Sequence, residues 1–205
     1  NHVDKNPLGW AKDTILTTEI IKSLLSTDQR DFVYAISVQP HGKYPSSPLG
    51  DEHPITVSSD VISEQDLVPF SYYVNQLYEE DAFLRSLIES LETYGEPTVL
   101  ILYGDHLPSI SAAEEYMAQG DLLQTEYVIW DNIGLEKQDR DLEAYQLSAS
   151  ILKKLGIRNG FLNSYHQSFE ENPRYQEYLE MLEYDMLYGK QAVYGGTSGY
   201  EPTDM

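Results

Sequence analysis

Apolar positions along this chain follow two patterns, short continuous runs and longer stretches with helical spacing. The runs read FVYAISV at 32–38, TVLILY at 98–103 and EYVIW at 126–130. Short apolar runs rich in β-branched and aromatic residues are typical of strands that are buried on both faces. Glycine or proline follows each run within a few positions, so the sequence predicts three strands that end at turns.

Stretches with helical spacing separate these runs. Apolar residues recur about every 3.6 positions from 64 to 93 and from 142 to 155, and shorter helices are expected at 15–25, 111–118 and 175–186. Strands that alternate with helices predict an α/β fold with a mainly parallel sheet and helices on both faces. Three or four strands make a small sheet for 205 residues, so we expect an incomplete domain.

The sequence predicts that the chain consists of part of one domain and a tail. We expect residues 1–190 to form one incomplete domain, and residues 191–205 to be a flexible tail because they are rich in glycine and polar residues. The start, NHVDKNPLGW, has no methionine and no signal-peptide pattern, which is typical of a cut inside a longer protein. No apolar stretch approaches the roughly 20 residues of a membrane span.

The charge of the chain restricts its partners. The 34 acidic residues outnumber 13 basic ones and give a formal net charge of −21. A field of that sign repels nucleic acid and anionic membrane surfaces. If the substrate is itself an anion, a bound divalent cation is the simplest way to reverse the local field. Cysteine is absent from the sequence, which excludes disulfides and thiolate metal sites.

Two residues able to bind a metal, Asp105 and His106, follow the run at 98–103 directly. Ligands of open α/β sheets bind outside the carboxyl ends of the strands, where these residues are expected. Adjacent side chains can converge on one ion only where the backbone turns, and Gly104 and Pro108 indicate such a turn. Carboxylate oxygen with imidazole nitrogen suits zinc or manganese, although further ligands must come from elsewhere. The alternative is that Asp105 caps a loop and His106 is a partly buried surface histidine.

His41 is the second candidate, because it follows the predicted strand 32–38 and could face the same crevice. With Lys43 it would offer two donors to an anionic oxygen, whereas the alternative is an exposed loop histidine. His53 is a weaker candidate, and His2 and His166 have no supporting context. No nucleophile can be identified, since the sequence has no G-x-S-x-G, P-loop or G-x-G-x-x-G motif.

Three segments together, FVYAISVQPHGKYP, YYVNQLYEEDAFLRSLIESLE and TVLILYGDHLPS, resemble the lipoteichoic acid synthase-like branch of the sulfatase / alkaline phosphatase superfamily. The resemblance extends from NPLGWAKD to about Ile157. It implies an alkaline phosphatase-like fold in which residues 1–190 are the C-terminal portion of a sulfatase-like catalytic domain. It also implies a membrane-anchored parent protein whose catalytic domain lies on the extracellular face of the bacterial membrane. Members of this branch transfer phosphoglycerol or act on related phosphate or sulfate esters.

The same resemblance implies roles for individual residues. Asp105 and His106 correspond to two ligands of a manganese-type ion, with zinc, magnesium and calcium as alternatives. His41 corresponds to a contact with the phosphoglycerol head group or the transferred phosphoryl group, and Lys43 is a further candidate for substrate binding. The nucleophilic threonine and an acidic metal ligand of the family lie upstream of the matching segments. We therefore expect the 205 residues alone to be inactive.

Two functions remain in competition. The first is part of a metal-dependent phosphoglycerol transferase or sulfatase-like hydrolase at the cell surface, with an anionic ester as substrate and the upstream half of the same domain as partner. Membrane contact would then come through upstream segments, and no nucleic acid is expected. The second is a catalytically inactive sulfatase-like domain that binds a head group, a glycan or a protein. A phosphomutase ranks below both, because its two-metal site needs more histidine and aspartate ligands.

Overall fold

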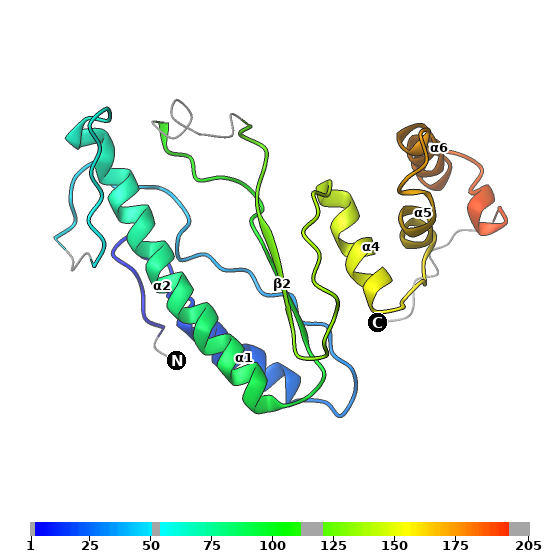
Figure 1. The fold of residues 1–205 in the computed structure, drawn as a ribbon, viewed down its shortest axis with the longest axis horizontal. Coiled ribbons are helices and arrows are strands. Elements are labelled where there is room, and N and C mark those ends of the chain that lie inside the picture. Colours follow the sequence, from blue (N-terminus) through cyan, green and yellow to red (C-terminus); the bar gives the residue numbers. More distant parts are fainter. Residues whose placement is uncertain (1–2, 51–53, 112–120, 197–205) are drawn as a thin grey trace. The chain divides into compact units, whose positions relative to one another are not determined.

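The computed structural model describes residues 3–50, 54–111 and 121–196. The chain divides into two compact units, Asn1–Gly134 and Leu135–Met205 (Figure 1). None of the helices among the described residues combines the length and the hydropathy that a bilayer crossing requires.

Two helices form the base of the first unit. Helix α1 spans Thr14–Leu24 and the long helix α2 spans Glu64–Tyr94, as the periodicity predicts. The Ser63 hydroxyl caps the start of α2 by accepting a hydrogen bond from the Asp66 N–H at 3.2 Å. At the other end, Gly95 adopts φ 75°, a left-handed conformation that glycine tolerates without strain.

The apolar core of the first unit lies between α1, α2 and a small sheet. Phe83, Leu87 and Leu91 are buried at successive turns of one face of α2. Four partly buried side chains of α1 pack against them, as do Leu100 and Trp130 from the sheet; those of α1 are Leu16, Ile20, Ile21 and Leu24. Burying a side chain such as Leu87 contributes about 1.5–3 kcal/mol.

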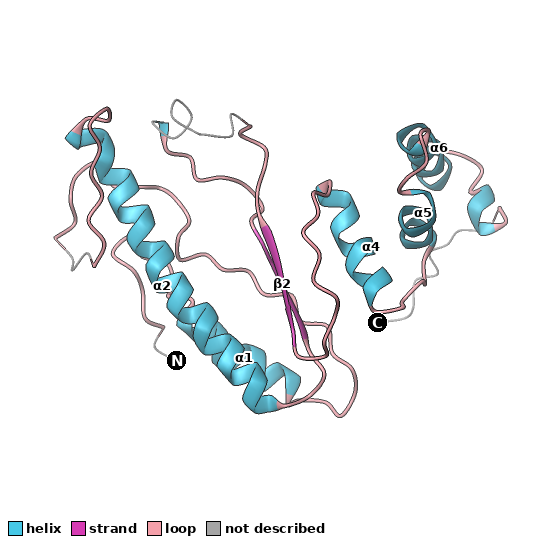
Figure 2. Ribbon diagram, viewed as in Figure 1, coloured by secondary structure: helices cyan, strands magenta, loops and turns pink. Residues whose placement is uncertain are grey.

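The sheet differs from the prediction of a mainly parallel one. In the described residues it consists of β1, Val99–Tyr103, and β2, Tyr127–Asp131, paired antiparallel with Ile101 opposite Ile129 (Figure 2). The chain between the strands returns to the end of β1 that it left, where the Gly104 N–H donates to the Glu126 carbonyl at 3.1 Å. A parallel pair would need a crossover to the opposite end of β1, so this connection dictates antiparallel pairing.

The run at 32–38 also differs from the prediction, because it forms no strand (Figure 2). It has no ladder partner among the described residues, and its side chains are exposed, with Phe32 at 90% and both Tyr34 and Ile36 at 65%. An apolar run becomes a buried strand only where neighbouring backbone and a packing face are present. Among the described residues, the run is held in place at Tyr34, whose Oη lies 3.0 Å from Tyr103 Oη, and from Ser37 onward.

The second unit is helical. Helices α4, Ala144–Lys154, and α6, Tyr175–Leu187, confirm two predicted helices, whereas α5, Phe161–Phe169, was not expected. A short 3₁₀ helix, η1, spans Ala192–Tyr194. Apart from Ser111, the helix expected at 111–118 lies outside the described residues, as do residues 197–205 of the expected flexible tail. That tail and the 1–190 boundary stay predictions.

Candidate functional site

Three aromatic rings from distant parts of the first unit meet at one place. The Trp10 and His41 rings are edge to face, with centroids 5.2 Å apart and planes at 69°. The His41 and His106 rings are also edge to face, with centroids 6.0 Å apart and planes at 81°. The structure therefore brings together the two histidines that the sequence analysis selected, and it adds Trp10 to them.

Asp105 and His106 lie in the loop that follows β1. Their side chains are 82% and 61% exposed, and Asp105 Oδ1 is 3.7 Å from His106 Nε2. The other ring nitrogen of His106, Nδ1, lies 2.9 Å from the Leu107 carbonyl. A proton on Nδ1 satisfies that carbonyl and leaves the lone pair of Nε2 on the side of Asp105. This is the arrangement in which a histidine ligates a metal through Nε2.

The donor set fits part of a divalent-cation site. Asp105 and His106 can supply one oxygen and one nitrogen to the same ion. No cluster of three or more His, Cys, Asp or Glu side chains suited to a metal occurs among the residues that the structure describes. Two ligands leave most coordination positions open, so a closed metal site needs groups from outside these residues.

His41 and Lys43 lie in the loop after residue 39, and both are exposed. His41 Nδ1 lies 2.5 Å from the Gly42 carbonyl, which leaves Nε2 for another partner. The hydroxyl of Tyr44 donates to the Pro40 carbonyl at 3.1 Å and closes the loop. Partial burial, with Tyr73 and Tyr72 nearby, raises the pKa of Tyr44 to about 12, so this hydroxyl remains a donor at physiological pH.

Three further histidines occur in the chain. His2 and His53 lie outside the described residues. His166 lies in α5 of the second unit, where Nδ1 is 2.5 Å from the Tyr175 hydroxyl. Burial lowers the pKa of His166, which favours the neutral ring.

A buried cluster of polar side chains supports the loop that carries His41, and the sequence analysis missed it. Its centre is Asp13, which is 2% exposed and precedes α1. Asp13 occupies the N-cap position of α1, but its side chain makes no capping hydrogen bond. Instead Asp13 Oδ2 accepts from Ser37 Oγ at 2.8 Å and from Gln39 N at 3.0 Å, and Oδ1 accepts from Val38 N at 3.2 Å.

Two buried amides extend this cluster to Trp10. Gln39 Oε1 accepts from the Asp13 N–H at 3.0 Å, and Gln39 Nε2 donates to Glu79 Oε2 at 2.6 Å. Asn6 Nδ2 donates to the Gln39 carbonyl at 2.9 Å, and Asn6 Oδ1 accepts from the Trp10 N–H at 2.9 Å. Buried amides need such partners. The partners are far apart in the chain, so no local sequence pattern signals the cluster.

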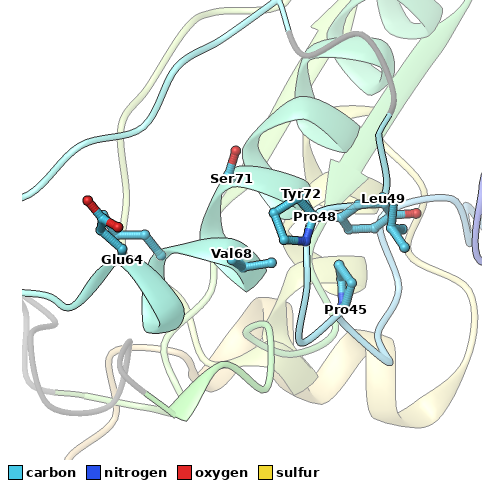
Figure 3. A pocket seen from close by; sticks show the side chains of 8 residues that line it. Pro45, Pro48, Leu49, Glu64, Val68, Ser71 and Tyr72 are labelled. Atoms are coloured by element: carbon cyan, nitrogen blue, oxygen red, sulfur yellow. The ribbon is translucent and has the colours of Figure 1, made fainter.

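A cavity of about 260 Å³ adjoins the same loop (Figure 3). Residues of the loop after Tyr44 and of the first turns of α2 line it, and Pro48 and Val68 contribute apolar surface from the two sides. Its full lining is Pro45, Pro48, Leu49, Glu64, Leu67, Val68, Ser71 and Tyr72. The cavity is a mainly apolar hollow whose only ionisable lining groups are Glu64 and Tyr72.

Comparisons with known proteins identify the family of this chain. The model of the sulfatase family matches residues 1–157. A protein of Rhizobium meliloti (strain 1021) named for the modification of cyclic β-1,2-glucan is 26% identical over 186 residues, and the match covers 81% of this chain and 29% of that protein. This chain therefore spans less than a third of that relative.

A solved structure gives the fold. The Streptococcus pyogenes phosphoglycerol transferase GacH, in complex with sn-glycerol-1-phosphate, aligns with a TM-score of 0.76 at 18% identity. The alignment covers 98% of this chain and 55% of the other. Together with the family match, this likeness shows that the chain folds as part of an alkaline phosphatase-like domain.

Proposed function

This chain belongs to the sulfatase family, and on that premise we propose that the whole protein is a metal-dependent phosphoglycerol transferase or a related hydrolase of phosphate or sulfate esters. One observation carries the proposal most of all. His41 packs against His106, whose Nε2 faces Asp105, so a candidate substrate contact stands beside two candidate metal ligands. The relative that shares the fold is a phosphoglycerol transferase holding sn-glycerol-1-phosphate, which is an anionic ester of the same class.

Asp105 and His106 would hold a divalent cation, with manganese as the expected ion and zinc, magnesium and calcium as alternatives. When bound, such a cation supplies positive charge that stabilises the oxygens of the reacting phosphoryl or sulfuryl group. The acidic chain needs this compensation, because a net charge of −21 otherwise repels an anionic ester.

His41 and Lys43 would bind the substrate. Because the Gly42 carbonyl occupies Nδ1 of His41, the imidazolium form donates from Nε2 to a substrate oxygen. Lys43 adds a second cationic donor in the same exposed loop. The attacking hydroxyl would come from a threonine upstream of residue 1 in the whole protein, together with a further acidic ligand. The 205 residues alone are then inactive.

The upstream part of the domain is the expected partner of this chain. The exposed apolar run at 32–38 supports this, since Phe32, Tyr34 and Ile36 present alternate positions of one extended segment to solvent. We infer that the run is a strand of the complete domain, which would sit on the extracellular face of a bacterial membrane.

Turnover by the whole protein tests the proposal. Phosphatidylglycerol and an aryl sulfate are offered separately with Mn²⁺, and release of the glycerol phosphate moiety or of sulfate is measured. We expect metal-dependent turnover of one of them, at least about a hundredfold loss with Asp105→Ala, and wild-type rates with Glu89→Ala, which removes an exposed acid of α2. Unchanged turnover in Asp105→Ala would contradict the assignment.

The second candidate function is an inactive sulfatase-like domain that binds a head group, a glycan or a protein. The observation in its favour is that Asp105 and His106 are the only paired metal-ligand candidates among the described residues of this site. It predicts that the whole protein binds sn-glycerol-1-phosphate without turning over any ester and without needing the metal.

A further inference from the structure

The buried Asp13 carboxylate anchors the segment that leads into His41. Its three hydrogen-bond donors are Ser37 Oγ, Val38 N and Gln39 N, consecutive residues that end two positions before His41. No lysine or arginine among the described residues pairs with Asp13. The neighbouring Lys12 instead pairs with Glu79, with Nζ 2.8 Å from Oε2. A buried carboxylate with three donors is a strong, directional anchor.

The ring of His41 depends on this anchor. The backbone N–H of His41 donates to the Val38 carbonyl at 3.1 Å, so residues 38–41 form a turn whose first residue Asp13 holds. The side-chain hydrogen bond of His41 reaches only its neighbour Gly42 and fixes nothing beyond the loop. Asn6 attaches Trp10 to the same cluster through the Gln39 carbonyl. Both rings of the Trp10–His41 contact are therefore held from one buried centre.

Glu80 of α2 completes the cluster as a second acid. One oxygen of its carboxyl group is fully buried and receives no hydrogen bond from the described residues. Two carboxylates in contact cannot both stay ionised without a large cost. Burial and the contact with Asp13 raise the pKa of Glu80 to about 8, and the hydroxyl of Ser37 offsets only part of this. The other charged groups of the cluster, Lys12 and Glu79, pair with each other.

We propose that Asp13 is a positioning residue for His41 and that Glu80 serves as its protonated partner, so that loss of the Glu80 proton releases the 38–41 turn and separates His41 from Trp10. A proton on Glu80 gives Asp13 a fourth donor. Without that proton, two adjacent negative charges repel each other inside the cluster, which weakens the hydrogen bonds from Val38 N and Gln39 N to Asp13. The consequence for turnover rests on the function proposed above, whereas the structural claim does not.

Fluorescence of Trp10 tests the structural claim. The chain has two tryptophans, so Trp130→Phe leaves Trp10 as the only indole, next to His41. We expect a step in its emission near pH 8, from Glu80, as the pH rises. Glu80→Gln should remove this step, whereas Glu89→Gln on the same helix should keep it. Persistence of the step near pH 8 in Glu80→Gln would overturn the proposal.

A contact measurement separates positioning from general stability. Nuclear Overhauser effects between the His41 and Trp10 rings should be lost in Asp13→Asn while the amide spectrum of α2 stays unchanged. Ring contacts of unchanged intensity in a folded Asp13→Asn would refute the role of Asp13. If that variant does not fold, Ser37→Ala removes one donor without touching the rings, and it should weaken the contact and move the step near pH 8.

Turnover of the whole protein then separates this inference from the proposed function. We expect both kcat and kcat/KM to fall above about pH 8 in the wild type and to persist to higher pH in Glu80→Gln, because displacement of His41 removes a proposed substrate contact. A kcat profile that is identical in the two proteins overturns the link to catalysis. If the whole protein turns over no ester while the fluorescence step is present, the proposed function fails and the positioning of His41 stands.

Discussion

The ring of His41 lies edge to face against that of His106, with centroids 6.0 Å apart. One histidine follows an irregular extended segment and the other follows β1, so the site is built from two loops rather than from one motif. This contact places His41 beside Asp105 and His106, where in the proposed function it would donate a hydrogen bond to a substrate oxygen.

Metal binding by the 205-residue chain should be weak. Asp105 and His106 provide two ligands and the described residues add no third, so most of the coordination sphere is left to water. Calorimetric titration with Mn²⁺ should show low affinity that decreases by at least about tenfold in Asp105→Ala. Asp121→Ala, a change of an exposed loop acid in the same unit, is the matched control. Tight one-to-one binding by the chain alone would show that the ligand set is already complete.

Stability should fall as the pH rises, because of Glu80. Its pKa is raised from 4.5 to about 8 in the folded chain, so the folded state holds a proton that the unfolded state has released between these values. The resulting stabilisation is complete below about pH 4.5 and is lost as the pH passes through about 8. Urea denaturation across this range should show a declining midpoint that flattens in Glu80→Gln. A decline of the same slope in the variant would assign it to other groups.

The core between α1 and α2 should depend on Leu87, which is 2% exposed. Leu87→Ala removes buried methyl groups and leaves a cavity, at a cost of about 2–5 kcal/mol in the free energy of unfolding. Leu77→Ala on the same helix, at a side chain that is 40% exposed, should change it by no more than about 0.5 kcal/mol. Equal losses in the two variants would place the core elsewhere.

Periodicity predicted the helices well and the sheet poorly. The spacing of Leu84, Leu87 and Leu91 was enough to identify α2 because a helix satisfies its own backbone hydrogen bonds. A strand needs a partner, and the composition of the 32–38 run could not show that the partner is missing from the described residues. The direction of the β1–β2 pairing likewise depends on where the connecting residues lead, which apolar spacing does not encode.

The sequence predicted part of the candidate site, but the structural reason given for that prediction was incomplete. Proximity of His41 to His106 was expected from parallel strand ends, yet the run before His41 is not a strand and the sheet is antiparallel. What holds His41 in place is the Asp13 cluster, whose hydrogen bonds join residues 24 to 26 positions apart. Such long-range polar contacts leave no periodic trace in a sequence. The roles of His41, Lys43, Asp105 and His106 stay predictions.

The run at 32–38 should become protected in the whole protein. Its backbone has no ladder partner among the described residues of this chain, and a strand of a complete sheet would acquire one. Hydrogen exchange should therefore be fast at residues 32–36 in the 205-residue chain and slower by orders of magnitude in the whole protein. The amides of β1 serve as the internal control, because they are paired with β2 in this chain. Equally fast exchange in both proteins would exclude a strand here.

Pulsed electron paramagnetic resonance of Mn²⁺ bound to the whole protein, labelled with ¹⁵N-histidine, tests whether Asp105 and His106 hold a catalytic metal as proposed. A directly coordinated imidazole nitrogen produces a characteristic modulation of the spin echo. We predict that this modulation is present in the wild type, is lost in His106→Gln and is unchanged in His166→Gln, a substitution in α5 of the second unit. A modulation that survives in His106→Gln with undiminished Mn²⁺ binding would contradict the account.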